Sequence, residues 1–448
     1  MRREFDAYVV ALTTVAVVAV TVLLAAPRVF TAGGDSMRGT AFRADELGFR
    51  PRVKPGIQVL LEQRLDLVRG KRVGIITNPT GVLPNLESDV DVLAGLRPDV
   101  DLVAIFGPEH GFRGTAQAGG SEGSFQDPVT RIPVYDLYGK SPQQIATVFQ
   151  TAGVDVVLFD IQDVGARFYT YIWTMADAME AAALSGTAFV VLDRPNPIGG
   201  LAVQGPVLDP AFSSFVGRYP IAQRHGMTTG ELALLFNDRF VPQRTGGRRA
   251  ELSVVPMEGW QRWMYYEDTG LPWVMPSVNM PTVETSVVYP GSGLFEGTNI
   301  SEGRGTTKPF QLLGAPYLDR RLASALNSLR LPGVAFREAA FTPMFSKYAG
   351  QMVHGVEVYV TDRRSYDPIR TAVAMMVTVR QLYGTAFRWE VDLGDSVHPY
   401  WIDKMTGSDR VRKAVDAGKV AEEIVAGWSE ELAAFRALRS RYLLYPED

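Results

Sequence analysis

Five short apolar segments rich in β-branched residues constrain the fold of this chain more than any other feature. They lie at residues 72–77, 101–106, 132–137, 154–159 and 188–192. Helical patterns separate most of them, notably at 88–96, 142–150 and 169–184. Strands that are apolar throughout and alternate with helices are typical of a parallel sheet covered on both faces. We therefore expect a doubly wound, Rossmann-like α/β domain over residues 56–247.

The sequence changes in character from about Arg248. Strand-like pieces appear at 250–255, 333–341 and 353–360, and helical patterns at 316–329, 366–383 and 404–441. These patterns predict a smaller auxiliary α+β domain with a helical C-terminal tail over residues 248–448. Between the strand-like piece at 250–255 and the helical pattern at 316–329, residues 260–316 are predicted to form a long loop. A loop of that length within a compact chain is usually functional, or else it indicates that an element within it has been misread.

The N-terminus differs from the rest of the chain in composition. Arg2 and Arg3 precede an uncharged, mostly apolar run from Ala7 to Ala26, and about 20 such residues span a bilayer core as a helix. Positive charge before the run places the N-terminus in the cytoplasm. We therefore expect residues 1–30 to be a signal peptide or a transmembrane anchor, followed by a linker over 31–55. Either way the body of the protein is extracytoplasmic, in the periplasm or cell envelope, anchored in the inner membrane or secreted after cleavage.

Charge, cysteine content and missing motifs exclude several function classes. The net charge of −4, from 45 basic and 49 acidic residues, argues against a nucleic-acid-binding protein. The chain has no cysteine, which rules out thiolate metal sites and a cysteine nucleophile. The four histidines lack metal-site spacing. No G-x-G-x-x-G follows the first strand, no Walker A motif occurs, and G-x-S-x-G is absent as a strand-to-helix elbow. We therefore expect no metal, no nucleotide cofactor and no serine nucleophile.

Polar residues cluster where the predicted strands end, which is where parallel α/β sheets bind ligands. Glu109 and His110 follow the strand at 101–106. A carboxyl held between a proline and a histidine and close to apolar side chains suits a general acid. The alternative is structural, because Glu109 can equally cap the next helix or pair with Arg113.

Two further strand ends carry candidates of the same kind. The strand at 154–159 leads into Asp160, Asp163, Arg167 and Tyr169, and the strand at 188–192 leads into a turn with Asn196. The two aspartates are candidates for catalysis, for orienting Arg167 or for capping a helix. Capping is the simpler interpretation for Asp160.

The long loop contains a second polar cluster over residues 295–306. Its glycines let the backbone approach a ligand closely, while Asn299, Glu302 and Arg304 supply hydrogen-bonding groups. The guanidinium of Arg304 is suited to holding a carboxylate with two parallel hydrogen bonds. His225 precedes a predicted helix cap at Thr228 or Thr229, with Glu231 near the N3 position, and is a further candidate for a substrate contact.

Several longer blocks give the chain a specific resemblance. They are residues 107–114, 160–171, 193–200, 205–208, 224–232, 295–309, 345–350 and 399–404. In this order they resemble the bacterial exo-β-N-acetylmuramidase family, from about Gly56 to the C-terminus. The resemblance implies a Rossmann-like domain with a smaller auxiliary domain and an active-site cleft between them. It also implies removal of N-acetylmuramic acid from the non-reducing ends of peptidoglycan fragments, or muropeptides.

The resemblance also implies roles for particular residues. Glu109 corresponds to the catalytic glutamate of the Gly-Pro-Glu-His-Gly motif, and Glu302, followed by Asp163, is the candidate for the second carboxyl. Glu180 falls in a similar block but is expected well down a helix. Val278 stands where the family pattern has proline, which bears on local loop shape. The candidate substrate-binding residues are His110, Arg113, Asp160, Arg167, Tyr169, Asn196, His225, Asn279, Asn299 and Arg304.

The chemistry of glycoside hydrolysis fits these residues. The reaction needs a proton donor at the leaving oxygen and a second group on the other face of the sugar, and it needs no metal. The lactyl carboxylate of muramic acid calls for an arginine such as Arg304, Arg167 or Arg113. Retaining, inverting and substrate-assisted routes all remain open. The alternative function is a membrane-tethered protein that binds sugars or muropeptides without turnover.

Overall fold

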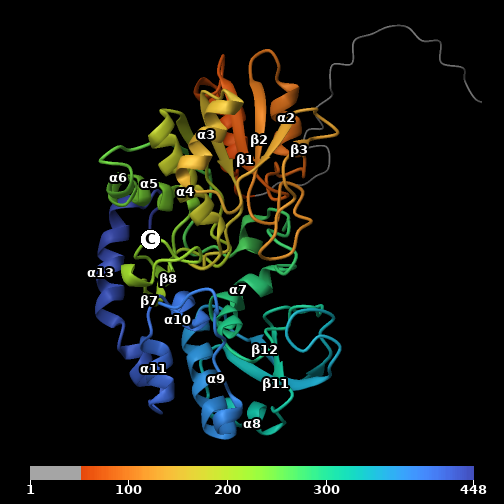
Figure 1. Ribbon diagram of the computed structural model, residues 1–448, viewed down its shortest axis with the longest axis vertical. Coiled ribbons are helices and arrows are strands. Elements are labelled where there is room, and N and C mark those ends of the chain that lie inside the picture. The colour runs from red at the N-terminus through yellow and green to blue at the C-terminus, as the bar shows by residue number, and fades with distance from the viewer. Residues whose placement is uncertain (1–51, 448) are drawn as a thin grey trace, which may run out of the picture. The chain divides into compact units, whose positions relative to one another are not determined.

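A seven-stranded sheet forms the centre of the larger part of the fold (Figure 1). The structure is a computed structural model that describes residues 52–447. The strands lie in the order β3-β4-β2-β1-β5-β6-β9, and every neighbouring pair is parallel except β3 with β4. Their bounds are β1 (Arg72–Thr77), β2 (Asp101–Gly107), β3 (Phe125–Gln126), β4 (Pro133–Asp136), β5 (Val156–Asp160), β6 (Ala188–Leu192) and β9 (Glu251–Val255).

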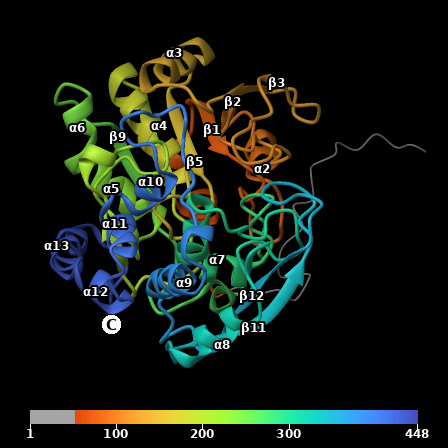
Figure 2. The same ribbon diagram turned by 60° about the horizontal axis from the view of Figure 1, so that its bottom comes forward.

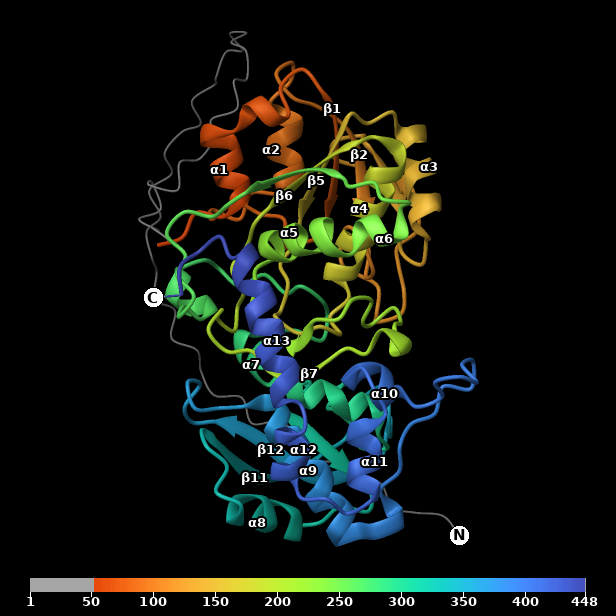
Figure 3. The same ribbon diagram turned by 90° about the vertical axis from the view of Figure 1, so that its left-hand side faces the viewer.

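Helices cover both faces of this sheet, as the sequence predicts. Ile75 and Leu158 point to the face covered by α1 (Gly56–Gln63) and α2 (Asp89–Gly95). The next residues along the strands, Ile76 and Phe159, point to the opposite face, covered by α3 (Pro142–Ala152), α4 (Tyr171–Ser185) and α5 (Thr229–Arg239). Figure 3 shows α1 and α2 on one side and α3 and the short α6 (Val241–Arg244) on the other. Numbered among themselves, the parallel strands follow the Rossmann order 3-2-1-4-5-6.

The position of β9 shows that one domain assignment made from the sequence is wrong. Residues 250–255 were expected in the second domain, but β9 pairs with β6 along its whole length. It is the edge strand of the sheet, and most of its residues are only partly buried. Its sequence therefore lacks the fully apolar character by which the inner strands are recognised.

A smaller antiparallel sheet lies in the C-terminal half, in the order β10-β12-β11. It consists of β10 (Leu312–Ala315), β11 (Val334–Phe341) and β12 (Val353–Val360), accompanied by α8 (Arg321–Ser328) and α9 (Pro368–Tyr383). Figure 2 shows β11, β12, α8 and α9 grouped together. The predicted strands at 333–341 and 353–360 are thus confirmed. A two-stranded antiparallel ribbon, β7 (Gln204–Val207) and β8 (Ala222–Arg224), follows the large sheet's β6.

The predicted loop over 260–316 contains regular structure. The helix α7 (Val283–Ser292) and β10 both begin within it. Pro290 and Gly291 lie in the last turn of α7, and because these residue types usually mark turns or loops, the helix is hard to recognise in the sequence. Gly291 is needed for close packing, because a Cβ atom there would lie 1.9 Å from the carbonyl oxygen of Pro368 in α9.

The C-terminal tail is broken into short helices and returns to the large sheet. Instead of one helical stretch over 404–441, the chain forms α10 (Trp401–Thr406), α11 (Arg410–Asp416), α12 (Ala421–Ala426) and α13 (Ser429–Arg439). In Figure 3, α13 runs up to α5. Beyond it, the hydroxyl of Tyr445 donates a 2.7 Å hydrogen bond to the buried carboxyl of Asp193, which follows β6.

Burial of Asp193 makes the stability of the fold depend on pH. Burial raises the pKa of this carboxyl from 3.8 to about 7, so between these values the folded protein holds a proton that the unfolded chain has released. The free energy of unfolding is therefore expected to fall as the pH rises from about 4 to 7, by at most about 4 kcal/mol for this group. In urea unfolding across this pH range, the free energy of unfolding of Asp193→Asn should fall less steeply with pH than that of the wild type. An equal dependence on pH in the two proteins would contradict the raised pKa of Asp193.

The predicted N-terminal anchor or signal segment at residues 7–26 lies outside the described residues, as does most of the linker at 31–55. Over residues 52–447, no helix is both long enough and apolar enough to cross a membrane. The anchor therefore stays a prediction from the sequence.

Candidate active site

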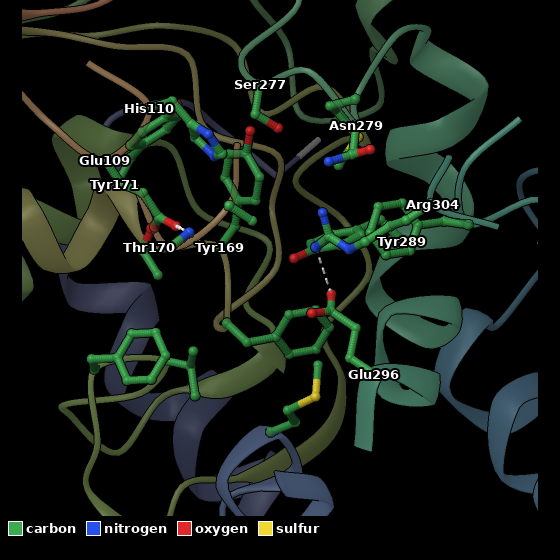
Figure 4. Close-up of a pocket in the computed structure, with 18 of the residues that line it drawn as sticks. Glu109, His110, Tyr169, Thr170, Tyr171, Ser277, Asn279, Tyr289, Glu296 and Arg304 are labelled. Carbon is green, nitrogen blue, oxygen red and sulfur yellow. Dashed lines mark hydrogen bonds and ion pairs between the residues drawn. The ribbon is translucent and has the colours of Figure 1, made fainter. Parts of the chain in front are cut away.

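A pocket of about 470 Å³ opens at the carboxyl ends of the large sheet's strands. One part of its wall comes from the segments after β2 and β5, including Glu109, His110 and Tyr169. The other part comes from the C-terminal half, including Asn279, Tyr289 of α7, Glu296, Arg304 and Trp401 of α10. Figure 4 shows Glu109 and Thr170 on one side of this pocket and Glu296 and Arg304 on the other.

Glu109 is held on its side of the pocket by two hydrogen-bond donors. The backbone N–H of Gly119 donates to Oε1 at 2.8 Å, and the hydroxyl of Thr170 donates to Oε2 at 2.6 Å. Since a hydroxyl also accepts hydrogen bonds, Thr170 can hold this carboxyl when it carries a proton. Arg113, the structural partner suggested by the sequence, pairs with Asp127 instead. Glu109 therefore faces the pocket without a cationic partner among the described residues.

His110 lies next to Glu109 in a strained turn. Its φ of 70° is in the left-handed region, which costs a non-glycine residue of the order of 1 kcal/mol. The ring is fixed because Nδ1 donates to the carbonyl oxygen of Ala116 at 2.8 Å. Such strain is found where the surrounding structure holds a side chain in a functional position, so His110 remains a candidate for substrate binding.

Across the pocket, two cations lie close to two carboxylates. Arg304 donates to Glu296 Oε1 at 3.1 Å, and its Nε lies 3.3 Å from Glu302 Oε1. Lys347 donates to Glu302 Oε2 at 3.1 Å. Burial raises the pKa of Glu296, and Arg304 offsets part of that rise. Arg304 and Lys347 both line the pocket, so a ligand on this side can contact two cationic groups whose charges Glu296 and Glu302 balance.

Three tyrosines complete the wall between these two sides. The ring of Tyr169 packs edge-on against Tyr171 and Tyr289, with centroids 5.1 and 5.7 Å away. Burial raises the pKa of Tyr169 and of Tyr289 well above the usual value. Both hydroxyls therefore stay protonated and can donate to the oxygen atoms of a ligand.

Comparison with known proteins identifies the family. The family models described as exo-β-N-acetylmuramidase NamZ, N-terminal and C-terminal, match residues 73–284 and 287–445. The chain belongs to the NamZ family. It is 49% identical over 397 residues to the peptidoglycan β-N-acetylmuramidase NamZ of Bacillus subtilis strain 168, covering 88% of this chain and 92% of that protein. The resemblance seen in the sequence motifs is thereby confirmed.

Two solved structures are also similar to this NamZ family chain. Both are DUF1343 family proteins from Bacteroides fragilis. The first is 38% identical with a TM-score of 0.80, covering 89% of this chain and all of that one. The second is 31% identical with a TM-score of 0.69, covering 88% of this chain and 99% of that one.

The structure does not bring the two predicted second carboxyls to the pocket surface. Glu302 is 2% exposed and is engaged by Arg304 and Lys347. Asp163 is also buried, where Oδ2 accepts from the N–H of Gly165 and lies 3.4 Å from His225 Nε2. Neither residue lines the pocket. Glu180 lies well down α4, as the sequence predicts. Its carboxylate accepts a hydrogen bond from the hydroxyl of Tyr219.

Among the predicted substrate-binding residues, His110, Tyr169, Asn279 and Arg304 line the pocket. The others have partners within the fold. Asp160 pairs with Arg194, Arg167 donates to three backbone carbonyls, and Asn196 donates to the carbonyl of Met227. His225 accepts from the N–H of Met227, Asn299 donates to the carbonyl of Ala386, and Arg113 pairs with Asp127. These six residues shape the loops around the pocket rather than lining it.

Sequence reasoning missed Glu296, Lys347, Tyr138 and Phe215, which line the pocket. Glu296 and Lys347 do occur in the sequence blocks 295–309 and 345–350. The blocks therefore marked the right segments, but the sequence does not show which of their side chains face the pocket. Tyr138 and Phe215 lie in loops with no distinctive motif. Within residues 52–447, His, Asp and Glu side chains form no group of three or more that could hold a metal ion.

Proposed function

We propose that this NamZ family chain is an exo-β-N-acetylmuramidase that releases N-acetylmuramic acid from the non-reducing ends of peptidoglycan fragments. The observation that carries the proposal is the pocket itself, where Glu109 and Glu296 lie on different sides and Arg304 and Lys347 lie beside Glu296. Two carboxyls meet the need of glycoside hydrolysis, and the cations suit the lactyl carboxylate that distinguishes muramic acid from glucosamine.

In the proposed reaction Glu109 is the proton donor. The bond between C1 of N-acetylmuramic acid and O4 of the next sugar breaks, and the proton of Glu109 goes to O4. The oxygen of a water molecule ends on C1, and a proton of that water restores Glu109. Glu296 acts on the other face of the sugar, and its raised pKa makes it a stronger base than an ordinary glutamate. The reaction as proposed uses no metal.

Arg304 is proposed to select muramic acid. Replacing Arg304 by Met should lower the preference for β-N-acetylmuraminides over β-N-acetylglucosaminides by about 10- to 100-fold in kcat/KM, the value of a charge-assisted hydrogen bond. Because the preference is the ratio of the kcat/KM values for the two substrates, any effect of the substitution on Glu296 cancels. Arg321→Met, at a largely exposed arginine, is the matched control. An unchanged preference would mean that residues other than Arg304 recognise the lactyl group.

The proposed activity is tested with 4-nitrophenyl β-N-acetylmuraminide. The purified full chain should release 4-nitrophenol, and EDTA should leave the rate unchanged. On glycan strands, N-acetylmuramic acid should appear from the start without shorter internal fragments. Release of internal fragments would contradict exo action, and loss of activity in EDTA that a divalent cation restores would contradict the metal-free route.

We also propose that the enzyme acts outside the cytoplasm, held at the membrane by its N-terminal segment. The support is the run from Ala7 to Ala26 behind Arg2 and Arg3. The full chain should sediment with membranes and be released by detergent, whereas a chain beginning at residue 31 should stay in the supernatant. Equal solubility of the two chains would contradict membrane anchoring.

A further inference from the structure

A second hollow of about 570 Å³ adjoins the active-site pocket. The two share Glu109, Tyr138, Thr170 and Phe215 as lining residues. The rest of the second hollow is formed by the turn before α3 and the first residues of α3, by the first half of α4 and by the loop around Ser213 and Ser214. Apart from Glu109 and Thr170, no residue that lines this hollow lies in a motif singled out in the sequence.

Glu109 is placed where the two hollows meet. A general acid must reach the oxygen that joins two sugars, so one sugar lies on each side of it. The side with Arg304 and Lys347 suits the sugar that carries the lactyl carboxylate. The second hollow, on the other side of Glu109, is then left for the sugar that departs.

The lining of the second hollow suits a neutral sugar ring. Phe215 is 54% exposed and presents an aromatic surface shared by both hollows. The buried hydroxyl oxygen of Ser214 has no hydrogen-bond partner in the described chain. Lys140 also lines the hollow and makes no ion pair with the described residues, whereas Arg218 is paired with Asp177 and Glu180. An apolar surface with a few convergent polar groups is typical of a small-molecule site.

We propose that the second hollow is the leaving-group subsite and binds the N-acetylglucosamine unit attached to C1 of the terminal muramic acid. This inference rests on the proposed muramidase activity. Lys140 donates a hydrogen bond to an oxygen of the leaving sugar, and Glu109 hands its proton to O4 at the boundary between the two subsites. The volume of the hollow is within the range of small-ligand pockets.

The test compares two substrates that differ only in the leaving group, N-acetylmuramyl-β-1,4-N-acetylglucosamine and methyl β-N-acetylmuraminide. Thr174 lines only the second hollow, and Thr174→Trp should fill it. This variant should lower kcat/KM for the disaccharide at least about tenfold while changing that for the methyl glycoside less than about twofold. Thr147→Trp, at an exposed site on α3, is the control and should change neither.

Lys140→Ala provides a second variant if the tryptophan does not fold. It should lower kcat/KM about three- to tenfold for the disaccharide only. Equal losses with both substrates, or no loss with either variant, would overturn the subsite while leaving the muramidase proposal intact. If the wild type hydrolyses neither substrate, the muramidase proposal fails and the subsite falls with it.

Discussion

Replacing Glu109 by Gln is expected to lower kcat for the disaccharide by about a thousandfold. Glutamine cannot give a proton to O4, and general acid catalysis contributes about 10²- to 10⁴-fold. The loss should be less than about tenfold for a 2,4-dinitrophenyl β-N-acetylmuraminide, because that leaving group departs without a proton. Steady-state kinetics with both substrates measure the difference.

The contrast between leaving groups separates a proton donor from a group that only shapes the pocket. Glu338→Gln, at an exposed glutamate on β11, is the matched control and should leave both rates unchanged. If Glu109→Gln lost activity equally on both substrates, Glu109 would act on the sugar itself and would not be the acid.

Replacing Glu296 by Gln is expected to lower kcat by about a hundredfold or more with both substrates, because a base or nucleophile is needed whatever the leaving group. In the wild type, kcat should fall on acidification at a higher pH than for an ordinary glutamate, since burial raises the pKa of Glu296. The variant should lack this dependence. A pH–rate profile of both proteins checks it.

Glu302→Gln is the matched comparison, because Glu302 contacts the same Arg304 yet is 2% exposed and absent from the pocket wall. Its effect should be about tenfold, through the positions of Arg304 and Lys347. A larger loss for Glu302→Gln than for Glu296→Gln would return the second catalytic role to Glu302.

The parallel sheet could be predicted because its inner strands are buried on both faces. β1 and β6 have the bounds expected from their apolar runs. The predicted capping box also forms, with Thr228 accepting from the N–H of Glu231 and the Glu231 carboxylate accepting from the N–H of Thr228. α7 was not predicted because Pro290 interrupts its helical pattern. β9 was predicted as a strand but assigned to the second domain, because its exposure at the sheet edge removes the apolar character of the inner strands.

The active site could be predicted only in part. Glu109 follows a strand directly, and the carboxyl ends of parallel strands meet at one edge of the sheet. Glu296 lies in a 3-10 helix of only five residues (Gly293–Gly297), and Glu302 lies in the loop that follows. Neither segment has a sequence period that shows which side chain faces the pocket. Asp160 and His225 also lie at strand ends, but Arg194 pairs with Asp160 and Asp163 lies beside His225 within the fold. Contacts between distant segments decided these positions.

The most direct test of the central claim follows N-acetylmuramyl-β-1,4-N-acetylglucosamine and the purified full chain by proton NMR. The proposal predicts free N-acetylmuramic acid and N-acetylglucosamine in equal amounts, at a rate proportional to the enzyme and greatly reduced in Glu109→Gln. The anomer of N-acetylmuramic acid that forms first also reports the stereochemical route. A disaccharide that binds but stays intact would contradict the enzyme and indicate a binding protein.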